Sequence, residues 1–212
     1  KVSEFNHLIA AVIILAIIIS FQTILQGDWP SVAQAFFFAA IIIAVSITSK
    51  KFMAYLLDAD VEHEIWNLSQ YGPAPAQHLK KPLPAGIIAP LLLSLISLGK
   101  IKAPVILTYE TKAKTYRASK RHGYYSYTEM TEFHNGLIGA AGIVSVLLIS
   151  IITYFLPASN LEYLARVSTF YAFFNLIPIS NLDGSQIFFG SRVLWTALAL
   201  ITIIFTVYAV II

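Results

Sequence analysis

The sequence predicts an all-α polytopic membrane protein with five to six transmembrane helices and a small cytoplasmic β element. Three observations lead to this prediction. Of the 212 residues, 58% are apolar and only 12% are charged. The mean hydropathy of +0.74 lies outside the range of soluble globular domains. Apolar runs of at least 17 residues recur along the chain, and each can cross or nearly cross a hydrocarbon layer of about 30 Å.

The apolar runs define the elements of one membrane domain that covers residues 1–212. A sixth run, 83–99, differs from the others because it contains Pro84, Gly86 and Pro90. Proline removes a backbone donor and kinks a helix, so this run is expected to be a re-entrant piece, an interfacial segment or a short span. The five predicted spans are 8–25, 32–48, 137–155, 169–189 and 194–212.

The polar connections carry the basic residues. Residues 100–136 predict a basic loop or hairpin, in which the β-branched run 103–109 indicates a strand. Lysine, arginine and tyrosine alternate after Thr111, which predicts either a solvated hairpin or a surface that binds lipid headgroups. A net charge of +3 is too small to indicate a nucleic-acid partner, and the lack of cysteine excludes disulfides and thiolate metal sites.

The distribution of Lys and Arg indicates the orientation. If 83–99 crosses the membrane, the basic residues divide almost evenly between the two sides. If it does not cross, nearly all of them lie on the side of the N-terminus and Arg166 alone lies on the other. The positive-inside rule favours the second arrangement, with five spans and with the N-terminus and the large polar loops in the cytoplasm.

One carboxylate, Asp183, interrupts the run 169–189. A charge at mid-membrane costs about 2.5–3.5 kcal/mol on insertion scales, so a partner or a function is expected. The surrounding segment, NLIPISNLDG at 175–184, resembles the N-x-x-P-x-x-x-L-D-G signature of the site-2 protease family of intramembrane zinc metalloproteases. Segments 51–66, 80–104 and 139–142 resemble further parts of that family in the same order.

The resemblance implies a site-2-protease-like helical core. It places Asp183 at the position of the family's third zinc ligand. It also implies a binding cavity formed with Asn175, Pro178, Ser180 and Asn181.

The metal motif of that family is degenerate here. In HExxH, two histidines bind zinc and the glutamate between them acts as general base. The corresponding positions hold Ser46, Ile47 and Lys50, and an aliphatic Ile47 cannot take a proton from water. Asp183 alone cannot hold a catalytic zinc, so the sequence predicts a divergent member with no catalytic residue and no cofactor. The only His-Glu pair, His63-Glu64, is expected in a solvated acidic loop.

We expect Lys50 to be the partner of Asp183. Lys50 takes the position of the family's second zinc-binding histidine, so its ammonium would replace the charge of the metal. Ser46, one turn earlier, is expected to add a hydrogen bond. The alternative is that Lys50 extends to the lipid headgroups and that helix-terminal amides, Ser180 or Asn181 satisfy Asp183.

Three functions remain open at this point. The first is a pseudoprotease that binds or scaffolds another membrane protein or a transmembrane segment. The second is an active intramembrane zinc metalloprotease that cleaves a transmembrane substrate and requires zinc. The third is a small-molecule transporter, supported weakly by a lone carboxylate in a kinked helix.

Overall fold

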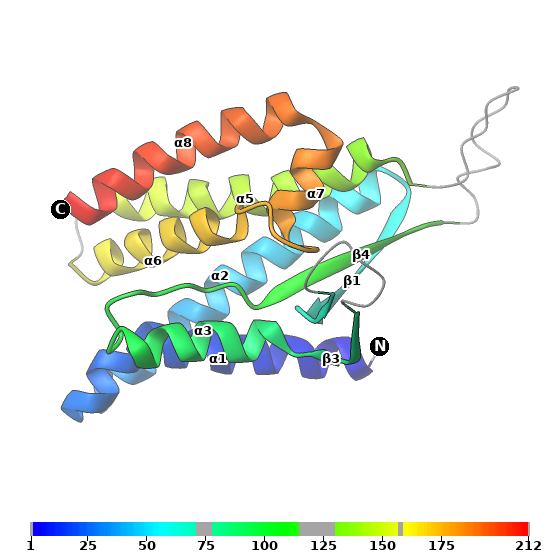
Figure 1. The fold of residues 1–212 in the computed structure, drawn as a ribbon. Helices are drawn as coiled ribbons and strands as arrows, with labels where there is room; N and C mark the ends of the chain where they lie inside the picture. The colour runs from blue at the N-terminus through cyan, green and yellow to red at the C-terminus, as the bar shows by residue number, and fades with distance from the viewer. Residues whose placement is uncertain (1, 71–77, 115–129, 157–158, 212) are drawn as a thin grey trace, which may run out of the picture.

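The structure is a computed structural model that describes residues 2–70, 78–114, 130–156 and 159–211. The described chain is mostly helical, with two small sheets at one end (Figure 1). Most of the basic, tyrosine-rich stretch, 115–129, lies outside the described residues, so its predicted hairpin and its lipid contacts stay predictions.

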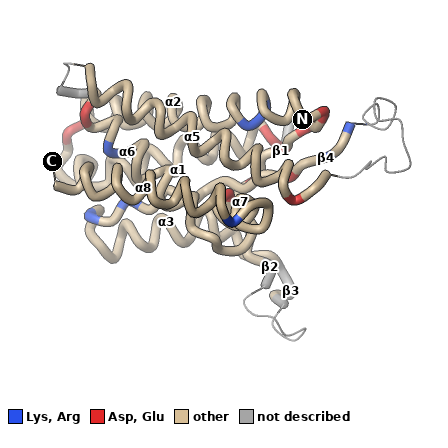
Figure 2. The backbone as a smooth tube through the Cα atoms, turned by 90° about the horizontal axis from the view of Figure 1, so that it is seen from above, with Lys and Arg blue, Asp and Glu red and all other residues tan. Residues whose placement is uncertain are grey.

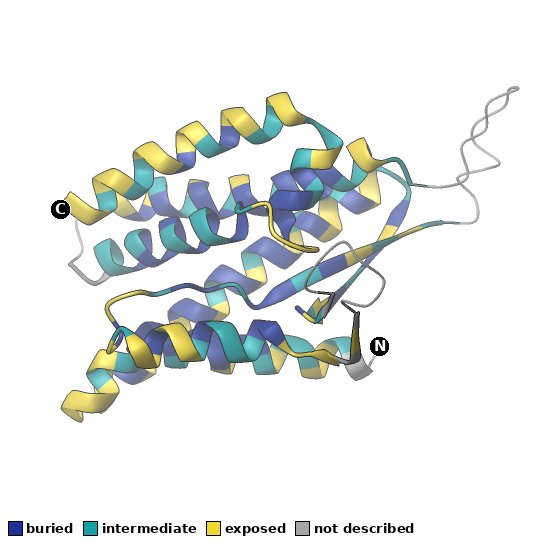
Figure 3. Ribbon diagram, in the orientation of Figure 1, coloured by how far each residue is buried: buried dark blue, intermediate teal, exposed yellow. Residues whose placement is uncertain are grey.

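Four helices are long and apolar enough to cross a membrane. They match four of the five predicted spans, and the charged residues of the described chain gather towards the two ends of the bundle (Figure 2). Helix α8 packs least, with only Leu198 and Thr202 buried, and presents most of its surface outward (Figure 3). The four helices are α1 (Val2–Gln26), α2 (Trp29–Leu56), α5 (Glu132–Phe155) and α8 (Arg192–Ile211).

The fifth predicted span, 169–189, is wrong as a continuous helix. The chain forms α6 (Ser159–Asn175) and a separate short α7 (Asp183–Gly190). Pro178 cannot donate to the helix ladder and its ring crowds the preceding turn. Ser180 then takes a left-handed φ of 51°, which a helix cannot accommodate. Asp183 therefore begins a helix instead of lying near the end of one.

This break is tolerated because side chains satisfy the carbonyls that it frees. Trp195 Nε1 donates to Leu176 O at 3.0 Å, and Ser185 Oγ donates to Ser180 O at 2.6 Å. Thr108 Oγ1 donates to the carbonyl of Asn181 at 2.8 Å. The loop 176–182 is thus anchored by α7, by α8 and by the strand that contains Thr108.

The ambiguous run 83–99 forms a short helix followed by a turn, and its membrane arrangement (re-entrant, interfacial or short span) stays a prediction. Its helix α3 (Ala85–Ile96) has 12 residues, or about 18 Å, which is too short to cross the hydrocarbon layer. Gly99 has a φ of 75°, and the chain then turns back and runs to strand β4 (Leu107–Ala113) (Figure 1). The predicted strand 103–109 therefore lies four residues too early.

The larger sheet pairs β4 with β1 (Ala59–Ile65) in antiparallel register, from Ala59 opposite Ala113 to Ile65 opposite Leu107. In the second sheet, β2 (Leu68–Gln70) pairs with β3 (His78–Leu83). Both sheets lie at the end of the bundle that holds the N-terminus, whereas the C-terminus lies at the other end (Figure 1).

This placement agrees with the topology in which 83–99 returns to its starting side. The cytoplasmic location of that side stays a prediction. One part of the charge count is wrong, because Lys102 lies at the far end with Arg166. Lys102 Nζ donates to the Tyr163 hydroxyl at 2.8 Å, and that hydroxyl donates to Ile19 O at 2.8 Å, near the end of α1.

Candidate functional site: a buried ion pair beside an open strand edge

The structure brings Lys50 and Asp183 together, as the sequence analysis expects. Lys50 Nζ lies 2.6 Å from Asp183 Oδ2, and the two side chains are only 3% and 1% exposed. The ammonium also lies 4.8 Å from the centre of the Tyr109 ring, where the ring's negative face attracts a cation. Lys50 is therefore held inside the protein and does not extend to the headgroups.

Three helices position the pair. Lys50 lies near the end of α2, and Asp183 is the first residue of α7, where the positive end of the helix dipole favours a carboxylate. Helix α5 gives the pair room through Gly142. A Cβ there would overlap Lys50 Cε and would lie 3.0 Å from Lys50 Cγ.

Tyr109 closes the site from the side of β4. Its hydroxyl donates to Asn135 O at 2.6 Å. A Cβ on Gly139 would come within 2.6 Å of that hydroxyl, so this second glycine of α5 is required for the close approach. Burial raises the pKa of Tyr109 well above its usual value, which keeps the hydroxyl neutral. The predicted helper, Ser46, is buried but gives Asp183 no hydrogen bond, so this part of the prediction is wrong.

The prediction that His63 lies in a solvated loop is wrong. It lies on β1, is 1% exposed, and its ring centre is 6.5 Å from that of Tyr109. Its Nδ1 lies 3.3 Å from Glu4 Oε1, and the same carboxylate oxygen lies 2.8 Å from Lys51 Nζ. Burial, together with the nearby Lys50 ammonium, lowers the pKa of His63 to about 3. A neutral histidine thus lies beside the ion pair.

The residues around Asp183 do not fit a zinc ion. A lysine ammonium lies where a cation would bind the carboxylate, and Ser46 and Ile47 supply no histidine or carboxylate. In the described part of the chain, no three His, Asp or Glu side chains are grouped to hold a metal. His63 and Asp183 are both buried, but Lys50 repels a metal from the carboxylate.

The four residues predicted to form a cavity divide into two groups. Asn175 is buried and donates through Nδ2 to Pro104 O at 3.0 Å and to Tyr171 O at 2.9 Å. Pro178 is exposed in the loop. Ser180 and Asn181 do line a cavity, of about 520 Å³, whereas Asn175 and Pro178 are not among its lining residues.

That cavity runs along the outer edge of β4. The carbonyl of Ile106 accepts from Trp66 N–H at 2.8 Å, and Lys114 N–H donates to Asp58 O at 3.1 Å. Peptide groups alternate between the two edges of a strand, so the even-numbered residues of β4 face β1. The outer edge is formed by the peptide groups of Leu107, Tyr109, Thr111 and Ala113.

Among the described strands, none pairs with this outer edge. Gln186 Nε2 donates to Tyr109 O at 3.0 Å. The charged side chains among the described lining residues of the cavity are Glu64, Glu110 and Glu132. The site therefore combines a strand edge that no described strand covers, and of which Gln186 occupies one carbonyl, with negative charge; such an edge binds extended chains, and the charge favours a basic ligand.

Sequence reasoning missed this edge and the burial of His63. The alternation in ADVEHEI at 59–65, with Val61 and His63 on one face, indicates a half-buried strand and was available as a signal. The pairing of β1 with β4 across about 50 residues carries no local signal. Comparisons with protein-family models, with curated proteins and with solved structures found no match for this chain.

Proposed function

We propose that the chain is a membrane-embedded binding protein that resembles a site-2 protease without a hydrolytic centre. The observation that carries this proposal is the 2.6 Å contact between Lys50 Nζ and Asp183. A positive charge already neutralises the carboxylate, so a divalent ion would have to displace a buried ammonium. Water activation of the kind that zinc provides requires several protein ligands, and they are not grouped here in the described residues.

The partner is an extended segment of another membrane protein. It adds as a third strand to the outer edge of β4, where the N–H groups of Tyr109 and Thr111 are directed. Main-chain hydrogen bonds supply affinity in this mode, and pockets for side chains supply specificity. A basic side chain of the partner meets Glu64, Glu110 and Glu132, which makes the segment basic rather than acidic.

The first test is the zinc content of the purified, detergent-solubilised protein, measured with and without Asp183→Ala. Zinc at background level in both proteins is the expected result. Near-stoichiometric zinc that disappears in Asp183→Ala would contradict the proposal and would favour the protease alternative, in which a transmembrane substrate is cleaved.

The second test addresses binding. A photo-reactive residue at the exposed position Asn181 is expected to cross-link a membrane protein in native membranes. The same residue at Val207, on the outward face of α8, is expected to cross-link different proteins. Thr111→Pro removes an outward N–H without touching the β1 pairing and is expected to abolish the capture at Asn181.

The matched control is Thr111→Val. It retains the N–H but loses the hydroxyl that donates to Asn135 Oδ1 at 2.5 Å. Capture that persists in Thr111→Val and is lost in Thr111→Pro, with unchanged circular dichroism, supports strand addition. Equal capture by both variants would remove strand addition as the binding mode.

A further inference from the structure

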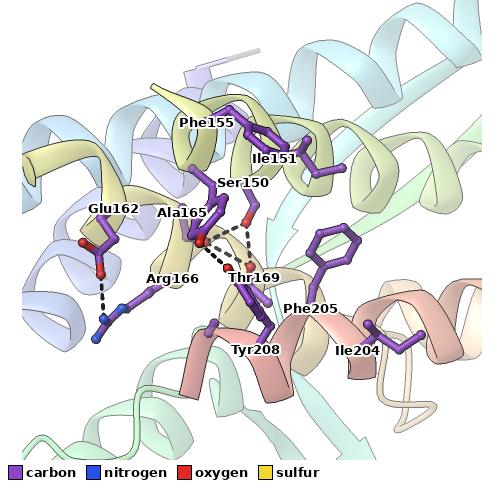
Figure 4. A pocket seen from close by; sticks show the side chains of 12 residues that line it. Ser150, Ile151, Phe155, Glu162, Ala165, Arg166, Thr169, Ile204, Phe205 and Tyr208 are labelled. Atoms are coloured by element: carbon purple, nitrogen blue, oxygen red, sulfur yellow. Dashed lines mark hydrogen bonds and ion pairs between the residues drawn. The ribbon is translucent and has the colours of Figure 1, made fainter. Parts of the chain in front are cut away.

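A second cavity lies at the opposite end of the bundle from the ion pair. It has a volume of about 440 Å³, within the range of ligand pockets. The last turns of α5 and α8 and the first turns of α6 enclose it (Figure 4). We call it the α5–α6–α8 cavity, and its lining residues include Ile151, Phe155, Ala165, Ile204, Phe205 and Ala209.

The interior of this cavity is effectively apolar. Its two inner hydroxyls are satisfied within the protein, since Ser150 Oγ donates to Ala165 O at 2.9 Å and Thr169 Oγ1 donates to the same carbonyl at 3.0 Å. The Tyr154 and Tyr208 hydroxyls are hydrogen-bonded to each other and connect α5 to α8. A hydrocarbon chain therefore meets no unsatisfied polar group in this space.

The rim of the cavity carries a cation. Arg166 donates through Nη2 to Glu162 Oε1 at 2.7 Å, and its side chain is 37% exposed (Figure 4). A guanidinium has five N–H donors, so this bond leaves others for a ligand. Lys102 lies close enough to Arg166 for the two cations to repel each other. With the Glu162 carboxylate counted, two cations and one anion lie at this place, which leaves a net attraction for an anionic headgroup.

The position of the cavity along the helices suits a lipid. Residues 150–155, 162–169 and 204–209 lie near helix ends, next to the C-terminal end of the bundle (Figure 1). The half-exposed Tyr154 and Tyr208 are of the type enriched where a membrane meets water. We propose that the α5–α6–α8 cavity binds one hydrocarbon chain of an anionic lipid, whose headgroup contacts Arg166.

The test uses the full chain in a neutral detergent and two single-chain lipids. Native mass spectrometry measures binding of lysophosphatidylglycerol, which is anionic, and lysophosphatidylcholine of the same chain length, which is zwitterionic. The anionic lipid is expected to bind about fivefold more tightly, the preference that one basic residue supplies near a membrane surface. Equal affinities would overturn the role of the charge.

Two variants distinguish binding of the lipid's hydrocarbon chain from binding of its headgroup. Ala209→Phe fills the cavity and is expected to weaken both lipids at least tenfold, whereas Leu200→Phe, an outward position on the same helix, leaves both unchanged. The double change Glu162→Gln and Arg166→Gln is expected to retain binding of the hydrocarbon chain and to remove the preference for the anionic lipid. The control for charge is Arg192→Gln, an exposed arginine outside the cavity, which keeps the preference. Unchanged lipid binding in a folded Ala209→Phe protein would overturn the cavity as the site.

Discussion

Removal of one member of the buried ion pair tests the centre of the structure. In Lys50→Met, the Asp183 carboxylate stays 1% exposed but loses its counter-ion, and Asp183 Oδ1 has no hydrogen-bond partner in the described residues. An uncompensated buried charge of this kind costs about 3–5 kcal/mol of folding free energy. The double variant Lys50→Met with Asp183→Asn has no buried charge left. Its loss of folding free energy is therefore expected to be smaller than the sum of the two single losses by at least about 2 kcal/mol.

Lys51 provides the matched control one position along the same helix. Its ammonium also pairs with a carboxylate, Glu4, at 2.8 Å, but the Lys51 side chain is 45% exposed. Lys51→Met is therefore expected to cost at most about 1 kcal/mol. Equilibrium unfolding in mixed dodecyl sulfate and maltoside micelles, followed by circular dichroism, measures the variants. A Lys50→Met cost as small as that of Lys51→Met, or a double variant no more stable than Lys50→Met, would refute the reasoning.

Three further predictions use the same unfolding assay. Gly142→Ala is expected to cost about 1–3 kcal/mol because its Cβ overlaps Lys50, whereas Val144→Ala on the exposed face of α5 costs less than about 1 kcal/mol. Asn175→Leu leaves the Pro104 carbonyl without its donor and is expected to cost about 1–3 kcal/mol. The exposed Asn181→Leu is expected to cost less, and equal costs would show that the hydrogen bond from Asn175 to Pro104 does not stabilise the fold. The third concerns pH, because the pKa of His63 falls from 6.5 to about 3 on folding. Only the unfolded chain binds the proton between these values, so this contribution to stability is complete above pH 6.5 and is lost as the pH falls towards 3. His63→Phe is expected to flatten that decline, and an unchanged pH profile would show that His63 is not its source.

Local patterns predicted what depends on local physics. Four spans follow from apolar length alone, because a helix satisfies its own backbone groups in lipid. The pairing of Lys50 with Asp183 followed from the rule that a charge in an apolar run needs a partner, combined with the position that the resemblance assigned to Lys50. The pairing could therefore be predicted, but the local structure around Asp183 could not, because Asp183 begins α7 and does not lie near the end of a continuous span.

The failures have a common physical cause. Hydropathy does not distinguish a continuous helix from two helices joined by an apolar loop, and Trp195, Ser185 and Thr108, which lie outside the loop 176–182, donate hydrogen bonds to its carbonyls. The strand at 107–113 began later than its β-branched run because its register is set by β1. The burial of His63 likewise results from contacts with Glu4 and Tyr109, which lie 59 and 46 positions away in the sequence.

The tether between Asn175 and Pro104 also sets an order of assembly. The two residues are 71 positions apart, and the returning half of the segment 83–106 is also anchored to α6 through Lys102 and Tyr163, which are 61 positions apart. At a synthesis rate of about 5–20 residues per second, the ribosome needs about 4–14 s to make the residue that completes this contact. During that interval, residues 83–106 are an apolar hairpin without their final support. We therefore expect residues 83–106 to complete their packing only after α6 has been made.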